Sequence, residues 1–270
     1  MPKRLLLAQD LSVMGDLSLT VALPLLEVQG VKTLPLPTSL LSTQSEGFGA
    51  PRVLQCSTWI KQTLAHLQTL ALQLDGALIG YLDDLATGQA LFEFLQAQKF
   101  ALTVIDPVFA DEGRFYPNLG PKHLALQKKL LRVADYATPN VTEAQFLTGI
   151  QLSQTPNLEE LQKLLEKTTS LLKKGGQVVI TGVTFGEKKG CLWFEEGRLR
   201  HCSYPKLAGH FYGSGDVFSA LLTGALWQGQ TFSQAVMQAT KATYAALCET
   251  EKNYSKRQEG IDISRLLHSL

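Results

Sequence analysis

A glycine-rich turn, Gly213-Ser214-Gly215-Asp216, holds the residues of this sequence that are best suited to chemistry. Its glycines permit a tight turn with uncovered backbone N–H groups, and the apolar run 217–222 that follows predicts a helix. The first N–H groups of a helix lack partners and carry partial positive charge, so such a turn can hold an anion. Asp216 stands beside it as a candidate proton acceptor. The simpler alternative is that Asp216 only caps the helix.

Other polar residues fall where short apolar runs end. Asp106 follows the run 101–105, where it can face phosphates or a metal-bound water, or can simply begin a turn with Pro107. Asn140 and Glu143 lie three residues apart at an expected helix start. They can orient the water shell of Mg²⁺, which prefers oxygen ligands, or form a capping box, and both roles can coexist. Thr181 ends an apolar run and is a candidate phosphate contact or an edge residue.

The hydropathy pattern predicts a fold that can bring these residues together. Short apolar segments alternate with longer amphipathic ones, which is typical of a doubly wound, mostly parallel α/β sheet flanked by helices on both faces. The expected strands are residues 4–8, 31–34, 77–79, 101–105, 136–138 and 178–181. The expected helices are residues 17–28, 57–74, 87–97, 121–134, 141–148, 158–174, 217–228 and 232–248. Residues 191–194 and 198–203 flank Glu195-Glu196-Gly197, which predicts a hairpin.

In a doubly wound sheet, ligands bind outside the carboxyl ends of the strands. The residues that follow the expected strands are therefore expected to meet at one crevice; they are residues 9–12, 80–81, 106–107, 139–140 and 182–183. The segment 35–51 shows no clear period and is expected to be a functional loop.

Length and composition are those of an ordinary globular protein. The chain has 270 residues, 45% of them hydrophobic, and no linker or repeat divides it, so we expect one domain over residues 1–270. The net charge is +1 and the basic residues are dispersed, which argues against nucleic-acid binding. No apolar stretch approaches the length of a membrane span or a signal sequence. We therefore expect a cytoplasmic protein without membrane contact.

Several kinds of site are absent from the sequence. The four cysteines (Cys56, Cys191, Cys202 and Cys248) form no CxxC pair, which argues against structural zinc and a disulfide framework. The sequence has neither a P-loop motif nor a G-x-G-x-x-G after its first strand. The five histidines form no pair at metal-ligand spacing, and only His210 is near a candidate site, where a flanking or surface role is expected.

The order of the motifs is more specific than any one of them. The motifs are, in sequence order, Gln9-Asp10-Leu11-Ser12, Gly80-Tyr81-Leu82, Asp106-Pro107-Val108, Thr138-Pro139-Asn140, Thr181-Gly182 and Gly213-Ser214-Gly215-Asp216. This order resembles the ribokinase-like superfamily and, within it, the pyridoxal/pyridoxamine kinases, over nearly the whole chain. The resemblance implies transfer of the γ-phosphate of ATP to the 5′-hydroxymethyl group of a vitamin B6 vitamer in pyridoxal phosphate salvage. It also implies Mg²⁺ and a homodimer, and leaves open a monovalent-cation requirement.

The resemblance also implies roles for single residues. Asp216 is the expected base, and Gly213, Ser214 and Gly215 are the expected anion hole for the migrating phosphoryl group. Residues expected on the nucleotide side are Asp106, Asp111, Asn140 and Glu143 around Mg²⁺, with Asp106 and Glu143 binding the metal largely through water, and Thr181 against a phosphate. Residues expected against the pyridine ring are Asp10, Ser12, Ser45 and Tyr81.

The sequence departs from the family pattern in three places. Asp83 and Asp84 stand where Gly-Ser is usual, Ala110 replaces a glycine, and the residues 44–47 (Gln-Ser-Glu-Gly) replace His-Thr-Gly-Gly. These changes bear on vitamer preference and turnover, so the preferred vitamer stays open.

Three other functions remain for comparison. A hydroxymethylpyrimidine kinase of thiamin synthesis has the same fold, but many such kinases carry a cysteine in the anion-hole motif that this chain lacks. A sugar kinase is disfavoured because its substrate motifs are missing. A non-catalytic vitamer-binding protein is the third alternative.

Overall fold

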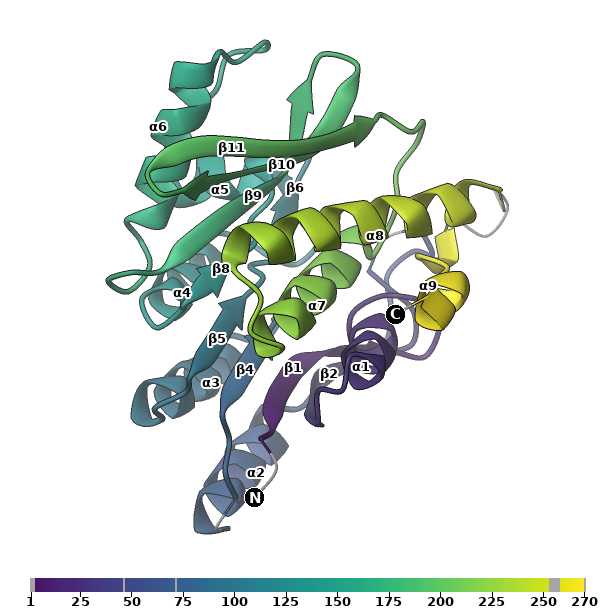
Figure 1. The fold of residues 1–270 in the computed structure, drawn as a ribbon. Coiled ribbons are helices and arrows are strands. Elements are labelled where there is room, and N and C mark those ends of the chain that lie inside the picture. The colour runs from purple at the N-terminus through teal and green to yellow at the C-terminus, as the bar shows by residue number, and fades with distance from the viewer. Residues whose placement is uncertain (1–2, 46, 71, 253–257, 270) are drawn as a thin grey trace.

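The structure is a computed structural model that describes residues 3–45, 47–70, 72–252 and 258–269. Within these residues, nine strands form one sheet in the order β11-β10-β9-β8-β5-β4-β1-β2-β3 (Figure 1). The strands of this sheet are β1 (Leu5–Ser12), β2 (Thr33–Leu41), β3 (Val53–Gln55), β4 (Gly76–Ile79), β5 (Leu102–Ile105), β8 (Tyr136–Ala137), β9 (Gln177–Phe185), β10 (Lys188–Glu195) and β11 (Arg198–Pro205). A separate two-stranded hairpin consists of β6 (Ala110–Asp111) and β7 (Arg114–Phe115).

The central strands are parallel and the strands at both edges are antiparallel. Strands β2, β1, β4, β5, β8 and β9 pair in parallel, while β3 runs antiparallel to β2, and β10 runs antiparallel to both β9 and β11. This arrangement confirms the predicted fold class. The chain moves outward from β1 in both directions, so the strand order reverses beside β1, which is where such sheets bind ligands.

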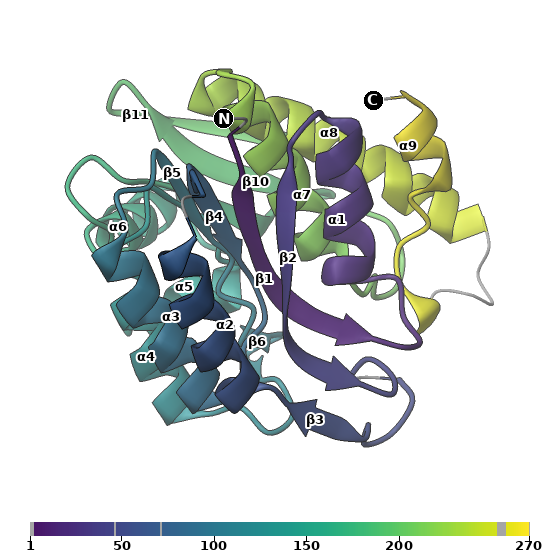
Figure 2. The same ribbon diagram turned by 90° about the horizontal axis from the view of Figure 1, so that it is seen from below.

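Side chains that alternate along the central strands bury against two layers of helices. In β1, Leu6 and Ala8 join one buried cluster while Leu5 and Leu7 join the other, because successive side chains of a strand point to opposite faces. The helices of the first layer are α2 (Ser57–Thr69), α3 (Leu85–Ala97), α4 (Pro121–Leu131), α5 (Val141–Thr148) and α6 (Leu158–Thr169). Those of the second are α1 (Leu19–Val28), α7 (Ser214–Trp227), α8 (Phe232–Lys252) and α9 (Ser264–Ser269). Figure 2 shows the two layers on either side of the sheet.

The expected loop 35–51 is wrong over its first part, because residues 35–41 belong to β2. The two prolines within residues 35–41, Pro35 and Pro37, argue against a strand in the sequence, and their positions explain how the strand tolerates them. They precede Ser39, the first residue of β2 that pairs with β3, so their missing N–H groups leave no bond to β3 unmade. The expected strand 4–8 likewise continues to Ser12, because its end pairs with the extended β2.

The expected hairpin at 191–203 is present and longer than predicted, as β10 and β11. The helices predicted over 57–74, 121–134 and 158–174 end earlier, at Thr69, Leu131 and Thr169. The hairpin β6–β7 and the short helix α9 were not predicted, since two-residue strands and a six-residue helix give too little period to detect.

The segment after residue 257 packs onto the loop that follows β1. Asp16 forms a bridge with Gly260, and the Asp16 carbonyl accepts a hydrogen bond of 3.1 Å from the backbone N–H of Ile261. The amide of Gln44 donates to the Gln258 carbonyl at 2.5 Å. Segments from the two ends of the described chain therefore fix each other beside the glycine-rich turn.

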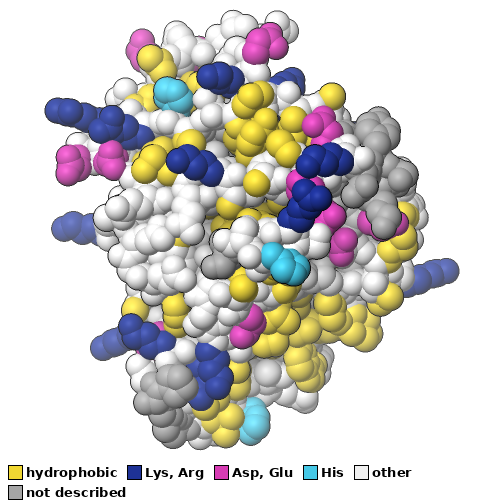
Figure 3. All heavy atoms as spheres, turned by 45° about the vertical axis from the view of Figure 1, so that its right-hand side comes forward, with side chains coloured by type: hydrophobic (Ala, Val, Ile, Leu, Met, Phe, Trp, Pro, Cys, Tyr) yellow, Lys and Arg dark blue, Asp and Glu magenta, His cyan; other side chains and the backbone are white. Residues whose placement is uncertain are grey.

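Charged side chains are scattered over the face shown in Figure 3, with Lys and Arg interspersed among other types. This distribution agrees with the dispersed charge of the sequence. Among the described residues, no helix combines the length and the hydropathy that crossing a membrane requires.

Candidate active site

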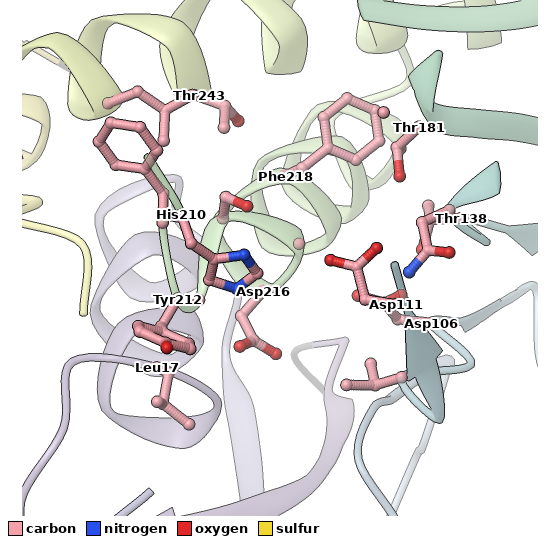
Figure 4. A pocket seen from close by; sticks show the side chains of 18 of the residues that line it. Leu17, Asp106, Asp111, Thr138, Thr181, His210, Tyr212, Asp216, Phe218 and Thr243 are labelled. Atoms are coloured by element: carbon pink, nitrogen blue, oxygen red, sulfur yellow. The ribbon is translucent and has the colours of Figure 1, made fainter. Parts of the chain in front are cut away.

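A cavity of about 900 Å³ opens at the carboxyl ends of the central strands. Its lining contains all but one of the residues predicted to form the site, namely Asp10, Ser45, Tyr81, Asp106, Asp111, Asn140, Glu143, Thr181, Gly213, Ser214, Gly215 and Asp216. Figure 4 shows Asp216, Asp106, Asp111 and Thr181 around this space. The exception is Ser12, which is buried and lies outside the lining; its hydroxyl donates to Asp10 at 3.4 Å. The structure thus brings together residues that are up to 206 positions apart, from Asp10 to Asp216.

The glycine-rich turn forms the N-terminus of α7. Gly213 is the N-cap residue, with φ of +81°, and the helix begins at Ser214. A Cβ at Gly213 would lie 2.9 Å from the Asp16 carbonyl oxygen and from the Leu17 Cβ, so only glycine fits this corner. Asp216 therefore lies within the first turn of the helix, and the alternative that it is the cap is wrong. Residues 213–216 line the cavity, and the first N–H groups of a helix have no partner within it, so this end of α7 can hold an anion.

Asp216 is buried, and a strand residue holds its carboxylate. The Gln9 amide donates to Asp216 Oδ1 at 3.4 Å, and the backbone N–H of Ser18 also stabilises the charged carboxylate. Burial nevertheless raises the pKa of Asp216 well above its usual value, and the neighbouring Asp106 adds to the shift. The folded protein therefore holds a proton on Asp216 more tightly than an exposed aspartate would.

The cavity contains further carboxyl groups whose pKa values are raised by burial. Burial raises the pKa of Asp106 from 3.8 to about 6, and that of Asp10 likewise to about 6. Burial, followed by the charge of Asp106, raises the pKa of Glu143 well above its usual value. Several acids that repel one another in one cavity are stable together only when protonated or when a cation joins them.

Asp106 provides the position that best suits such a cation. Its Oδ2 is buried and has no hydrogen-bond partner among the described residues. A Cβ on Gly215 would lie 3.8 Å from this oxygen, so the glycine leaves open the space between Asp106 and the helix. No group of three or more His, Cys, Asp or Glu side chains in the described chain is arranged to enclose a metal ion. A single carboxylate such as that of Asp106 suits Mg²⁺, which often uses one or two carboxylates, waters and substrate phosphates.

Asn140 and Glu143 form the capping box that the sequence offered as one of their two roles. The Asn140 side chain accepts from the backbone N–H of Glu143 at 2.9 Å, and Glu143 Oε2 accepts from the backbone N–H of Asn140 at 2.9 Å. The Asn140 amide also donates to the Ala110 carbonyl at 2.7 Å, and Glu143 Oε1 accepts from the backbone N–H of Phe109 at 2.8 Å. These bonds fix the loop that follows Asp106, and give each oxygen of Glu143 a backbone N–H donor.

Thr181 lies within β9 and not at its end, so that expectation is wrong. Its backbone N–H donates to the Pro139 carbonyl at 2.9 Å, and Thr181 bridges Asn140. Gly182 follows with φ of +72°, and the pairing with β10 shifts register there. This bulge lies in the antiparallel pairing with β10, and Thr181 lines the cavity beside it.

The substrate side was predicted only in part. Tyr81 lines the cavity with Asp10, and burial, followed by the charge of Asp83, raises the pKa of its hydroxyl. Asp84 caps α3 by accepting from the backbone N–H of Ala86 at 3.0 Å, so this departure from the family pattern has a structural role. Asp83 lies outside the lining. Glu46 lies outside the described residues.

The cavity lining includes residues that sequence reasoning missed, among them Lys189, Lys206 and Tyr212. Gln9, which follows the expected first strand and was expected at the crevice, supports Asp216 from outside the lining. The two lysines come from β10 and the loop after β11, which no motif links to the site. His210, expected to be flanking or exposed, lines the cavity.

Replacing Asp106 with Asn is expected to stabilise the ligand-free protein at neutral pH. The pKa of Asp106 rises from 3.8 to about 6 on folding, so the free energy of unfolding falls as the pH rises through that window. Asp106→Asn removes this penalty, with a gain on the order of 2–3 kcal/mol at pH 7.5 and almost none at pH 3.5. Urea unfolding at both pH values measures the difference. A gain that is larger at the lower pH would contradict the raised pKa of Asp106.

Known proteins resemble this chain in both sequence and structure. The family model described as phosphomethylpyrimidine kinase matches residues 26–260. The crystal structure of pyridoxal kinase from Lactobacillus plantarum is similar over 100% of this chain and 96% of its own, with a TM-score of 0.93 and 35% identity. A Bacteroides thetaiotaomicron structure named for a phosphomethylpyrimidine kinase, in an orthorhombic form with pyridoxal, covers 100% of this chain and 96% of its own, with a TM-score of 0.92 and 30% identity.

Curated sequences give the same two names. The hydroxymethylpyrimidine/phosphomethylpyrimidine kinase of Haemophilus influenzae is 31% identical over 65% of this chain and 65% of its own length. A protein named for pyridoxal kinase from Caenorhabditis elegans is 30% identical over 59% of this chain, and the match spans 49% of its length. The chain thus spans between about half and two thirds of these curated relatives. It belongs to the phosphomethylpyrimidine kinase family and has the ribokinase-like fold of the solved pyridoxal kinases.

Proposed function

We propose that this protein is a kinase that transfers the γ-phosphoryl group of ATP to the 5′-hydroxymethyl group of a vitamin B6 vitamer. The single observation that carries the proposal is the placement of Asp216. Its carboxylate lies in the first turn of α7, held by Gln9, with Asp106 across the cavity. A proton acceptor beside an anion hole, facing a metal-binding acid, is the arrangement that phosphoryl transfer needs.

The chain's residues act on the acceptor and on the transferred group. Asp216 takes the proton of the vitamer hydroxyl as the oxygen forms its bond to the γ-phosphorus. The bond between that phosphorus and the β,γ-bridging oxygen breaks, and ADP leaves with the electron pair. The N–H groups of the turn Gly213-Ser214-Gly215 hold the phosphoryl oxygens as charge shifts during transfer.

A divalent ion fits the same cavity. Asp106, through its unpartnered Oδ2, would bind Mg²⁺ directly or through water, and Glu143 would act through water. When bound, Mg²⁺ neutralises charge on the phosphates. Asp216 would accept the proton more readily with the ion in place, because a nearby cation favours the charged form of an acid.

The same cavity also supports a second candidate, a hydroxymethylpyrimidine kinase. The family name and the Haemophilus influenzae relative favour this acceptor. Asp216 and Ser214 in a turn without cysteine favour the B6 vitamer, as does the similarity to the Lactobacillus plantarum pyridoxal kinase. Both acceptors carry a hydroxymethyl group on an aromatic ring, so the transfer chemistry is shared.

An assay of ADP formation with pyridoxal, pyridoxamine, pyridoxine and hydroxymethylpyrimidine tests the proposal. We expect the highest kcat/KM with a B6 vitamer and loss of turnover when EDTA removes Mg²⁺. Faster turnover of hydroxymethylpyrimidine would move the assignment to thiamin synthesis. Calorimetric binding of a vitamer without ADP formation would instead support a non-catalytic vitamer-binding protein.

A further inference from the structure

His210 lies on the loop between β11 and α7, and its side chain points into the cavity (Figure 4). Its Nδ1 is 3.7 Å from Glu112 Oε1, and its ring lies against that of Tyr212, with 4.5 Å between ring centroids. Glu112 belongs to the turn of the β6–β7 hairpin, on the side of the cavity that carries Asp111. His210 thus spans from the glycine-rich turn toward the nucleotide side.

The surroundings of His210 are acidic. The carboxyl groups that line this part of the cavity come from three elements: Asp111 and Glu112 from the β6–β7 hairpin, Asp106 after β5, and Asp216 from α7. The lysines of the lining, Lys189 and Lys206, come from β10 and from the start of the loop after β11. A triphosphate placed among these acids needs a donor of positive charge beside them, in addition to the metal.

A bound anion can replace the contact between His210 and Glu112. The side chain of Glu112 is 65% exposed and that of His210 is 37% exposed, and the 3.7 Å separation exceeds a hydrogen bond. An ion pair of this kind in water contributes little by itself. The imidazole can therefore keep its position against Tyr212 while one ring nitrogen turns to a bound anion.

We propose that His210 is a phosphate-contacting residue that donates an N–H to the γ-phosphate of ATP. This inference rests on the proposed kinase function. Because Glu112 lies beside Nδ1, Nε2 is the ring nitrogen that can carry the N–H donated to the phosphate.

Calorimetry on the whole protein with Mg²⁺ tests this role without turnover. The two titrants are ADP and the β,γ-imido analogue of ATP, which has a γ-phosphate that cannot be transferred. His210→Gln is expected to weaken binding of the analogue by about tenfold or more, the range for a charge-assisted hydrogen bond, and binding of ADP by less than about twofold. His210→Arg, which keeps an N–H donor, is expected to recover most of the lost affinity.

Two further variants separate a phosphate contact from a structural role. His268→Gln, on α9 and outside the cavity lining, should change neither affinity. Glu112→Gln should weaken the analogue by a smaller factor, and by almost nothing when His210 is already Gln. Thermal unfolding of each variant confirms that the protein is folded in the titration.

The binding data distinguish failure of the phosphate contact from failure of the kinase proposal. Unchanged binding of the analogue by His210→Gln, or an equal loss for the analogue and for ADP, would overturn the γ-phosphate contact while leaving the kinase proposal intact. Wild-type protein that binds neither nucleotide would overturn the proposed function and this inference with it.

Discussion

Replacing Asp216 with Asn is expected to lower kcat by about 10²- to 10⁴-fold, the range for loss of a general base. The asparagine side chain has the same shape and can still accept hydrogen bonds from Gln9 and Ser18, the groups that hold the wild-type carboxylate. It cannot take up the proton of the acceptor hydroxyl. KM values for both substrates should change little, so steady-state kinetics with the best vitamer separate the lost chemistry from lost binding.

The same substitution, which lowers kcat, is expected to raise the free energy of unfolding at neutral pH. Burial and Asp106 raise the pKa of Asp216 well above 3.8, so the ligand-free folded protein binds a proton more tightly at this site than the unfolded chain does. The free energy of unfolding therefore falls as the pH rises from the unfolded pKa through the folded one. Asp216→Asn should unfold at a higher urea concentration than wild type at pH 7.5 and at a similar concentration at pH 3.5.

Near-normal turnover by Asp216→Asn would remove Asp216 from the role of base. A large drop in kcat together with a lower urea midpoint at pH 7.5 would indicate damage to the fold instead of lost proton transfer. Thr223→Ser, two turns further along α7 and also buried, serves as a control for disturbance of the helix.

Replacing Gly213 with Ala is expected to abolish most of the activity and to destabilise the protein. The new Cβ would lie 2.9 Å from the Asp16 carbonyl oxygen, a backbone atom, and the residue has φ of +81°. Either the turn or the loop after β1 must move, and the N–H groups at the start of α7 move with it. Loss of one such donor costs on the order of 2.7–4 kcal/mol in the barrier, so we expect kcat to fall by about 10²-fold or more.

The chain provides a matched control for this substitution. Gly229, just after the other end of α7, has φ of +84°, and nothing lies within 4 Å of the position of its missing Cβ. Gly229→Ala should therefore lose only the stability that the left-handed conformation costs, about 1–2 kcal/mol, and keep its kcat. Equal kcat values for the two variants, measured with urea unfolding alongside, would show that the anion hole does not depend on the shape of this corner.

Sequence reasoning predicted that the candidate residues meet at one cavity because local rules govern their positions. Asp106 ends a buried strand, and Gly213 and Asp216 begin a helix, so the carboxyl-end rule for parallel sheets was sufficient to predict that they meet. The positions of Thr181 and of β2 were predicted less well. Thr181 depends on a bulge opposite β10, and β2 depends on which of its sides remains unpaired at Pro35 and Pro37. Both are properties of the assembled sheet.

The charge state of the site could not be predicted from the sequence for a similar reason. The pKa of Asp216 depends on how completely the other elements exclude water and on the distance to Asp106, neither of which is encoded near residue 216. His210 was expected to be peripheral because no spacing links it to Glu112, which is almost a hundred positions earlier. Asn140 and Glu143 were predicted with both of their roles open, and the capping box is the one that the hydrogen bonds display.

The clasp between residues 258–261 and the loop that follows β1 has a consequence for biosynthesis. Asp16 lies against both Gly213 and Gly260, and the Gln258 carbonyl holds Gln44. A nascent polypeptide on the ribosome can pair β1 with β2 and β4 early, but the corner at Gly213 lacks one of its walls until residue 261 has left the exit tunnel. The candidate site is thus completed long after the central strands have emerged, however early the sheet itself assembles.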